Sequence, residues 1–233
     1  MRFKFLLLAI SILFSVRSLA NQDPEFSGWS AIFHSQRLNP KLGLHLDVQA
    51  RSSDEFDYLK NVLVRPGVTF FFNNQINSTL GYGFINSKIK SDVQDINFTE
   101  HRVWEQLIYI QKIKSQSFTH RFRLEQRFIE QAQSDLFSQR LRYFLRTLIP
   151  LSKHEGAFQK GIFVGLQNEL FLNLQNKDKM NNHFFDQNRA YGAFGYRFAP
   201  AFDLELGYMN QRIKQRNGGL TNHIIQIAAY TRF

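Results

Sequence analysis

Apolar and polar residues alternate with a period of two along most of the chain, and helical periodicity is hard to find. Leu44, Leu46 and Val48, for example, are separated by polar or charged residues. The alternation predicts eleven strands, over residues 27–37, 41–51, 59–72, 75–89, 99–113, 118–131, 138–150, 159–173, 184–198, 201–213 and 222–233. Many are far longer than the roughly five or six residues of an ordinary strand, and a strand that crosses a bilayer needs about 9–11. The pattern therefore favours an all-β fold that spans a membrane.

Short and long connections alternate between the predicted strands. The short ones fall near residues 39–41, 73–74, 115, 152–157 and 200–201, and longer polar segments cover residues 52–58, 91–97, 131–137, 175–183 and 215–221. In outer-membrane barrels the short turns face the periplasm and the long loops face outward. The alternation brings the last strand to the periplasmic side at Phe233. A final strand that ends on an aromatic residue resembles those that the barrel-insertion machinery reads, so we expect Phe233 to be an insertion signal.

The number of predicted strands conflicts with the expected architecture. Single-chain bacterial barrels have an even number of strands, whereas the alternation predicts eleven. Either one predicted strand is wrong, or a short extra segment closes the seam between the first and the last strand. We therefore expect an antiparallel, up-and-down transmembrane β-barrel of about 10–12 strands.

The first twenty residues read as a secretory signal peptide. Arg2 and Lys4 precede an apolar run over residues 5–16, and Ser18-Leu19-Ala20 forms a small-x-small cleavage site. The apolar run is shorter than the ~20 residues that a membrane-spanning helix needs. We expect residues 1–20 to be removed and residues 21–233 to form the barrel, in the outer membrane of a Gram-negative bacterium.

Composition limits the chemistry. The chain has no cysteine, which excludes a disulfide scaffold, thiol catalysis and cysteine-ligated metal. Its formal net charge is +10 at pH 7, and a basic chain favours either nucleic acid or anionic lipid headgroups. An exported protein does not meet nucleic acid, so we expect outer-membrane lipid and the insertion machinery as partners. The histidines are not spaced as metal ligands, and we expect neither a metal site nor a cofactor.

The alternation by itself does not say which face lines the interior, because the apolar face points inward in a soluble barrel and outward in a membrane barrel. Strand length, turn asymmetry and the signal peptide favour the membrane arrangement. The polar faces then form an interior charge network, which we expect to contain Arg51, Arg65, Glu105, Arg121, Arg123, Glu125, Arg127, Arg140, Arg142, Arg146, Glu169 and Arg189. Asp47 and Glu205 are further candidate partners for these arginines.

The stretch over residues 99–113 can be read in two phases. In one phase, Trp104-Glu105-Gln106 corresponds to Leu124-Glu125-Gln126, and Glu105 points inside like Glu125. The expected network follows this phase. The other phase places Glu100, Arg102 and Gln106 together on the inner face.

Short motifs along the chain resemble a known family. They are Leu63-Val64-Arg65-Pro66-Gly67, Gly81-Tyr82-Gly83, Glu100-His101-Arg102-Val103-Trp104-Glu105-Gln106, Arg121-Phe122-Arg123-Leu124-Glu125-Gln126-Arg127-Phe128, Arg140-Leu141-Arg142-Tyr143, Glu169, Arg189 and Gly207-Tyr208. Their order resembles the bacterial domain-of-unknown-function family 2490 over nearly the whole mature chain. The resemblance implies an outer-membrane barrel and no established activity.

Two functions fit an arginine-rich interior. A hydrogen-bonded network can fill a narrow barrel and make it rigid, and this reading is favoured because small barrels leave little open space. Alternatively, rings of arginine select anions, so the interior would be a narrow pore for small anionic solutes. We therefore expect a structural outer-membrane protein or such a pore.

Two further classes stay open as alternatives. A lipid-modifying outer-membrane enzyme needs a serine within reach of a histidine, but the histidines are scattered, and His34 and Ser35 point to opposite faces of one strand. We therefore expect no catalytic residues. The other alternative is a secreted soluble barrel that binds a hydrophobic ligand in its interior.

Overall fold

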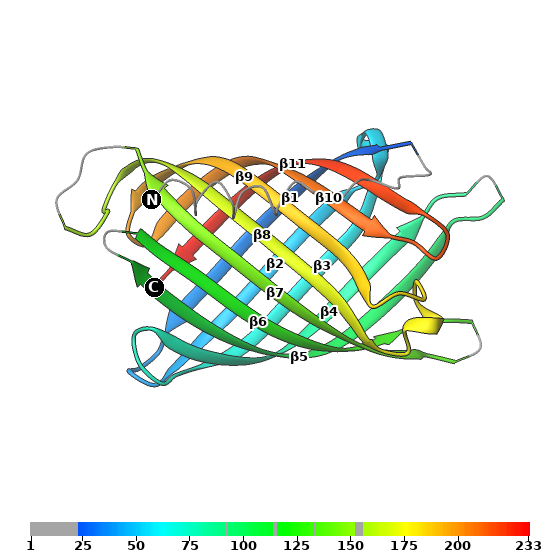
Figure 1. Ribbon diagram of the computed structural model, residues 1–233, viewed down its shortest axis with the longest axis horizontal. Coiled ribbons are helices and arrows are strands. Elements are labelled where there is room, and N and C mark those ends of the chain that lie inside the picture. The colour runs from blue at the N-terminus through cyan, green and yellow to red at the C-terminus, as the bar shows by residue number, and fades with distance from the viewer. Residues whose placement is uncertain (1–22, 92, 114–115, 133, 152–155) are drawn as a thin grey trace, which may run out of the picture.

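The chain forms a closed β-barrel, in a computed structural model that describes residues 23–91, 93–113, 116–132, 134–151 and 156–233 (Figure 1). The signal peptide predicted over residues 1–20 lies outside these residues. The described part contains eleven strands: β1 (Glu25–Arg37), β2 (Leu42–Ser52), β3 (Leu59–Phe71), β4 (Ile76–Ile89), β5 (Ile96–Ile113), β6 (Gln116–Ile129), β7 (Leu136–Pro150), β8 (Gly161–Gln175), β9 (Phe185–Ala199), β10 (Phe202–Lys214) and β11 (Gly219–Arg232). The predicted all-β barrel is confirmed, and each predicted strand is present within a few residues of its expected ends.

Helices play almost no part in the fold. Two 3-10 turns, η1 (Asp54–Phe56) and η2 (Lys177–Lys179), lie in the connections after β2 and β8. No helix in the described part of the chain is long and apolar enough to cross a membrane.

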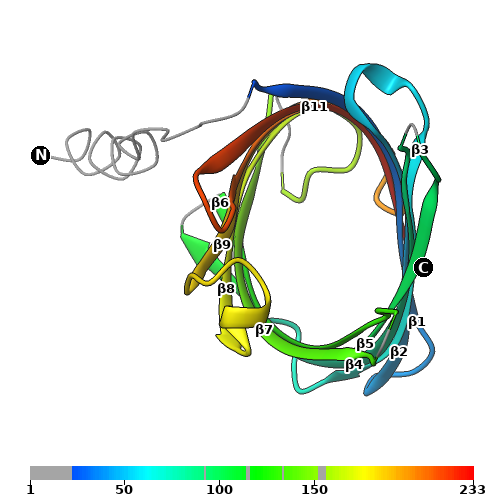
Figure 2. The ribbon, with the colours of Figure 1, turned by 90° about the vertical axis from the view of Figure 1, so that its right-hand side faces the viewer.

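Each strand pairs antiparallel with the next one along the chain, from β1 to β11. The pairing follows the alternation, because cross-strand neighbours on one face share their polarity: Val48 lies opposite Val64, and Leu124 lies opposite Leu141. Viewed along the barrel, the strands form one continuous oval wall (Figure 2).

The seam differs from the prediction. β1 pairs with β11 in parallel, in a register that runs from Glu25 opposite Asn222 to Ser35 opposite Arg232. Ten successive reversals of direction make the first and the eleventh strand run the same way, so an odd barrel can close only with one parallel pair. The expectation of a wholly antiparallel barrel is therefore wrong. No predicted strand is wrong and no extra segment closes the seam, within the residues that the structure describes.

Side chains build the tight turns at one end of the barrel. The Asn39 carboxamide oxygen accepts the backbone N–H groups of Lys41 and Leu42, both at 2.9 Å. Asn73 does the same for Gln75 and Ile76, both at 2.8 Å. These are asparagine-initiated turns, which satisfy the backbone where the chain reverses.

The two ends of the barrel carry different connections (Figure 1). The turns over residues 38–41, 72–75 and 200–201 lie at one end, and η1 and η2 lie at the other. The connection between β7 and β8 departs from the expectation of a short turn, since β7 ends at Pro150 and β8 begins at Gly161; residues 152–155 of it lie outside the described residues. The short turns predicted near residues 39–41, 73–74 and 200–201 are therefore confirmed, whereas the long loop predicted over residues 215–221 is reduced to residues 215–218, because β11 begins at Gly219.

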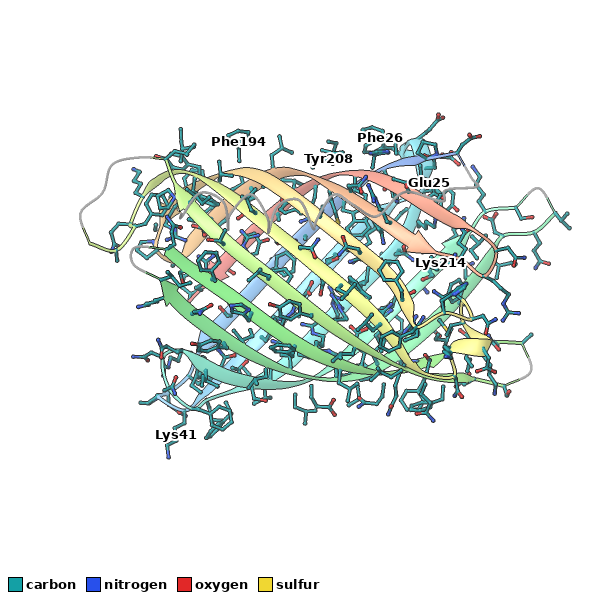
Figure 3. The ribbon with its side chains drawn as sticks, viewed as in Figure 1. Glu25, Phe26, Lys41, Phe194, Tyr208 and Lys214 are labelled. Atoms are coloured by element: carbon teal, nitrogen blue, oxygen red, sulfur yellow. The ribbon has the colours of Figure 1, made fainter. Side chains whose placement is uncertain are left out.

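The wall is inverted relative to a soluble protein. Phe26, Phe194 and Tyr208 project outward from it (Figure 3), and the Phe194 side chain is 69% exposed. Inside, Glu125 is 0% exposed and Arg123 is 1% exposed. Charged residues are thus buried while large apolar residues face outward.

An apolar cluster fills part of the interior next to the seam. It consists of Trp29, Tyr191, Ala193, Met209 and Ile224, from β1, β9, β10 and β11. The interior is therefore not polar throughout, as we expected it to be, but polar over only part of its wall.

Trp104 on β5 is a buried aromatic residue outside this cluster, and it is fully enclosed. Its indole ring occupies the space next to Gly81 on β4, where any Cβ atom would collide with the ring. The glycine at position 81 therefore allows the large side chain to point inward.

Candidate functional site

Glu125 lies at the centre of the interior charge network. Its Oε2 accepts two hydrogen bonds from Arg140, from Nε at 3.0 Å and from Nη2 at 2.7 Å. Its Oε1 accepts Nη1 of Arg142 at 2.5 Å, and Nη1 of Arg102 lies 3.8 Å from Oε2. A carboxylate that is buried away from solvent needs such donors, because burying an unpaired charge costs a large free energy.

Arg142 links this carboxylate to a second one. Its Nε and Nη2 donate to Oε1 of Glu169 at 2.9 and 2.7 Å. Arg121 donates to the same oxygen at 2.6 Å, reaching from β6 to β8 past the intervening strand β7. The other end of the Arg140 guanidinium donates to Asp186 on β9 at 2.9 Å. The network therefore joins strands that are not neighbours in the sheet.

A second group of ion pairs lies on β2, β3, β5 and β6. The Glu100 carboxylate accepts two hydrogen bonds from Arg102, at 2.6 and 2.8 Å, and two from Arg127, at 2.5 and 3.1 Å. Arg65 pairs with Asp47 at 2.6 Å. Each of these side chains is buried.

A third group lies on the opposite wall. Arg146 on β7 pairs with Glu205 on β10 and donates to the Tyr230 hydroxyl on β11 at 3.3 Å. The Asp203 carboxylate accepts two hydrogen bonds from Arg197, at 2.7 and 2.9 Å, and one from Arg232, at 2.8 Å. Arg146 thus reaches past β8 and β9, which lie between β7 and β10 in the sheet.

Three interior arginines lack a carboxylate within ion-pair distance among the described residues. Arg51 donates to Gln49 at 3.1 and 2.5 Å. Arg189 donates through Nε to Gln187 at 3.2 Å. Arg123 donates to Gln106 at 3.1 and 2.7 Å.

Aromatic rings support these three guanidinium groups instead. Arg51 lies 3.8 Å and Arg189 lies 5.0 Å from the ring centroid of Trp29. Arg123 lies 4.2 Å from that of Trp104. A cation over an aromatic face is attracted to it, by about 2 kcal/mol or more where water is excluded. The interior is therefore positively charged beyond what its carboxylates neutralise.

A cavity of about 120 Å³ lies within the network. Arginines from β2, β3, β5, β7 and β9 surround it, which places it in the middle of the barrel rather than against one wall. Its lining residues are Arg51, Leu63, Arg65, Arg102, Arg140, Arg142, Phe171, Gln187 and Arg189.

The structure places nearly all predicted network residues inside, but Glu105 is on the outer face. Glu105 is exposed and accepts Nε2 of Gln126 at 3.2 Å. The inward phase of β5 is the other one, with Glu100, Arg102 and Gln106 inside. The expectation for Glu105 is therefore wrong, because the local likeness to the stretch around Glu125 carries no information about the phase of β5.

The network also contains residues that were not predicted from the sequence. Glu100 and Arg102 follow from choosing the correct phase of β5. Asp203, which binds Arg197 and Arg232, lies two residues before Glu205 in the predicted strand over residues 201–213, so the period of two places it on the same inner face. Asp47 and Glu205 were expected as partners, and both are paired with arginines.

Phe233 follows the last residue of β11 and is exposed. Its backbone N–H donates to the carbonyl oxygen of Ser35 at 2.9 Å, and its own carbonyl oxygen accepts the N–H of Arg37 at 2.5 Å. These hydrogen bonds continue the parallel seam to Phe233.

Four of the histidines pair with threonine or tyrosine hydroxyl groups. His34 lies 2.8 Å from the hydroxyl of Thr231, and His120 lies 2.9 Å from that of Tyr143. His101 and His223 are paired in the same way, with tyrosines on neighbouring strands. Within the residues that the structure describes, no group of three or more potential ligands could hold a metal ion.

Comparison with known proteins gives a family and one relative. The family model described as "Protein of unknown function (DUF2490)" matches residues 26–222. An uncharacterized protein of Methylorubrum extorquens is 26% identical over 191 residues, which cover 80% of this chain and 79% of the relative. No solved structure matches the chain significantly.

Proposed function

Since the chain belongs to the DUF2490 family of proteins of unknown function, we propose from its geometry that it is a structural outer-membrane β-barrel of a Gram-negative bacterium. Its ion-paired interior would keep the barrel narrow and rigid. Outer-membrane lipid would cover its wall, and the barrel-insertion machinery would assemble it after cleavage near Ala20.

The apolar outer wall carries this proposal. Large apolar side chains are exposed on every strand from β1 to β6 and from β8 to β11. Burying apolar surface stabilises by roughly 25 cal/mol per Å², and soluble monomers rarely expose large contiguous apolar patches. One such residue from each of these strands is Ile32, Leu44, Val68, Leu80, Leu107, Phe122, Leu166, Phe194, Leu206 and Ile227.

The strand dimensions support the same proposal. β8 and β9 each contain 15 residues, and β2, the shortest strand, contains 11. A tilted strand needs about 9–11 residues to cross a bilayer. The wall is therefore tall enough to span a membrane on all sides.

The interior supports a structural role over a wide pore. Arg146 reaches from β7 to Glu205 and Tyr230, and Arg121 reaches from β6 to Glu169. A network of charge-assisted hydrogen bonds between non-neighbouring strands resists deformation of the barrel. Purified protein in a planar bilayer should therefore show no stable conductance steps, and large regular steps would contradict a filled interior.

Membrane fractionation tests the location. The full chain, expressed in a Gram-negative host, should lose its signal peptide and sediment with outer-membrane markers. It should also stay in the membrane after carbonate extraction, which releases peripheral proteins. Recovery of the protein in the periplasmic supernatant without detergent would contradict the proposal.

A further inference from the structure

We propose that the central cavity is a binding site for one small oxyanion, a phosphate or a short carboxylate, held between Arg51 and Arg189. The site lies inside the barrel, so this inference goes beyond the proposed function and does not depend on where the barrel is located.

The lining of the cavity has one sign of charge. Six of its lining residues are arginines, and none is an aspartate or glutamate. Like charges that face a common space repel each other, and a bound anion or water has to offset this repulsion. An anion in the cavity would therefore interact favourably with every charged residue around it.

The arginines around the cavity divide into two kinds. Four of them are neutralised by carboxylates that lie outside the lining: Arg65, Arg102, Arg140 and Arg142. Among the described residues, the partners of Arg51 and Arg189 are glutamine oxygens and aromatic rings: Trp29 lies beneath both guanidinium groups, and Arg189 also lies over Phe171. These two positive charges are the ones that a ligand would neutralise.

Arg189 has unused hydrogen-bond donors at the cavity. Its Nε binds Gln187, whereas its two Nη atoms donate to no acceptor among the described residues. The same holds for Nη1 of Arg51. A guanidinium group offers a rigid fork of donors that matches the oxygens of phosphate and carboxylate groups. The unused donors therefore define the contacts of the ligand.

The size of the cavity limits the ligand. A cavity needs roughly 10–15 Å³ of such space to hold one water, so about 120 Å³ accommodates several waters or one small anion. The ligand class is thus a compact oxyanion.

Titration calorimetry of the complete barrel in detergent tests the site. Inorganic phosphate, added at constant ionic strength, should bind with a stoichiometry of one per chain. Arg51→Gln and Arg189→Gln should each weaken binding at least tenfold, because each removes a charged donor from the ligand. Arg51→Lys should also weaken it, since lysine keeps the charge but loses the fork.

Arg123→Gln is the matched control. Arg123 also lies over a tryptophan ring and also donates to a glutamine, but it does not line the cavity. Its replacement should change phosphate affinity less than twofold. An equal loss of affinity in Arg123→Gln and Arg189→Gln would overturn the site, because the effect would then come from general interior charge.

Tryptophan fluorescence gives a second measurement of binding that is independent of the heat measured by calorimetry. The chain has two tryptophans, so Trp104→Phe leaves Trp29 as the only one, beneath Arg51 and Arg189. Phosphate should change the Trp29 emission saturably, and acetate or succinate shows whether carboxylates bind as well. An identical response to chloride at equal ionic strength, or no saturable response to any oxyanion, would overturn the proposal. Either result leaves the membrane location untouched.

Discussion

The guanidinium group of Arg189 on β9 lies over the indole ring of Trp29 on β1, 5.0 Å from the ring centroid, although two strands separate them in the sheet. Such a contact requires the barrel to be narrow enough for side chains from distant strands to meet. Interior residues of small barrels fill the available space in this way. The polar interior is thus a packed layer of side chains, in which the central cavity is a local gap.

The buried carboxylate of Glu125 should be essential for stability. Glu125→Gln removes the negative charge that Arg140 and Arg142 share, and breaking a buried pair costs about 3–5 kcal/mol. The urea midpoint of unfolding from lipid vesicles should fall accordingly. Glu105→Gln is the control: Glu105 lies on the outer face, and the loss of its charge there should leave stability unchanged or raise it. Equal destabilisation by both changes would contradict the inside–outside assignment.

An arginine on the middle of the outer wall should be poorly tolerated. Leu206 lies near the centre of β10 and is 60% exposed, so Leu206→Arg should destabilise the barrel in lipid by about 2–4 kcal/mol. Leu38→Arg is the matched change at the short-turn end, where the cost should be about 0–1 kcal/mol. Unfolding in vesicles measures both, and similar costs would argue against a lipid-covered wall.

A side chain at position 81 should collide with Trp104. Gly81→Ala should lower stability by about 1–3 kcal/mol, since overpacking a well-filled interior forces neighbouring side chains to shift. Gly192→Ala is the control, because a Cβ at Gly192 would make only an ordinary contact, 3.7 Å from Leu166. Thermal unfolding in detergent compares the two, and restoration of Gly81→Ala by Trp104→Phe would identify the collision as the cause.

The parallel seam makes a prediction about cross-linking. Phe26 lies opposite His223, and His34 lies opposite Thr231, so cysteine pairs at these positions should form disulfides. The crossed pairs, Phe26 with Thr231 and His34 with His223, should not. The chain has no native cysteine to interfere. Cross-linking of the crossed pairs alone would show that β1 and β11 are antiparallel.

The strands could be predicted from the sequence because their alternation is local. The closure of the barrel could not, since parallel pairing of β1 with β11 depends on the number of strands in the whole chain. The phase of β5 was also undetermined locally, because both of its faces carry polar residues. What decides it is a contact between strands: Trp104 points inward over Gly81, and Glu105 is therefore turned outward.

The candidate site was predictable only in part for the same reason. The arginines follow from the polar faces of their strands. Their grouping into paired and unpaired cations depends on contacts between distant strands. The meeting of Arg51 and Arg189 at Trp29 is one of these.

Spin labelling along β10 distinguishes a barrel with lipid outside and a charged interior from a soluble barrel. Single cysteines at residues 203 to 209 would each carry a nitroxide in reconstituted vesicles. Labels at Leu204, Leu206 and Tyr208 should collide frequently with lipid-soluble oxygen, and labels at Asp203, Glu205 and Gly207 should be protected from it. Oxygen accessibility should therefore alternate with a period of two along β10. Equal access of a water-soluble relaxation agent to Leu204, Leu206 and Tyr208 would contradict it.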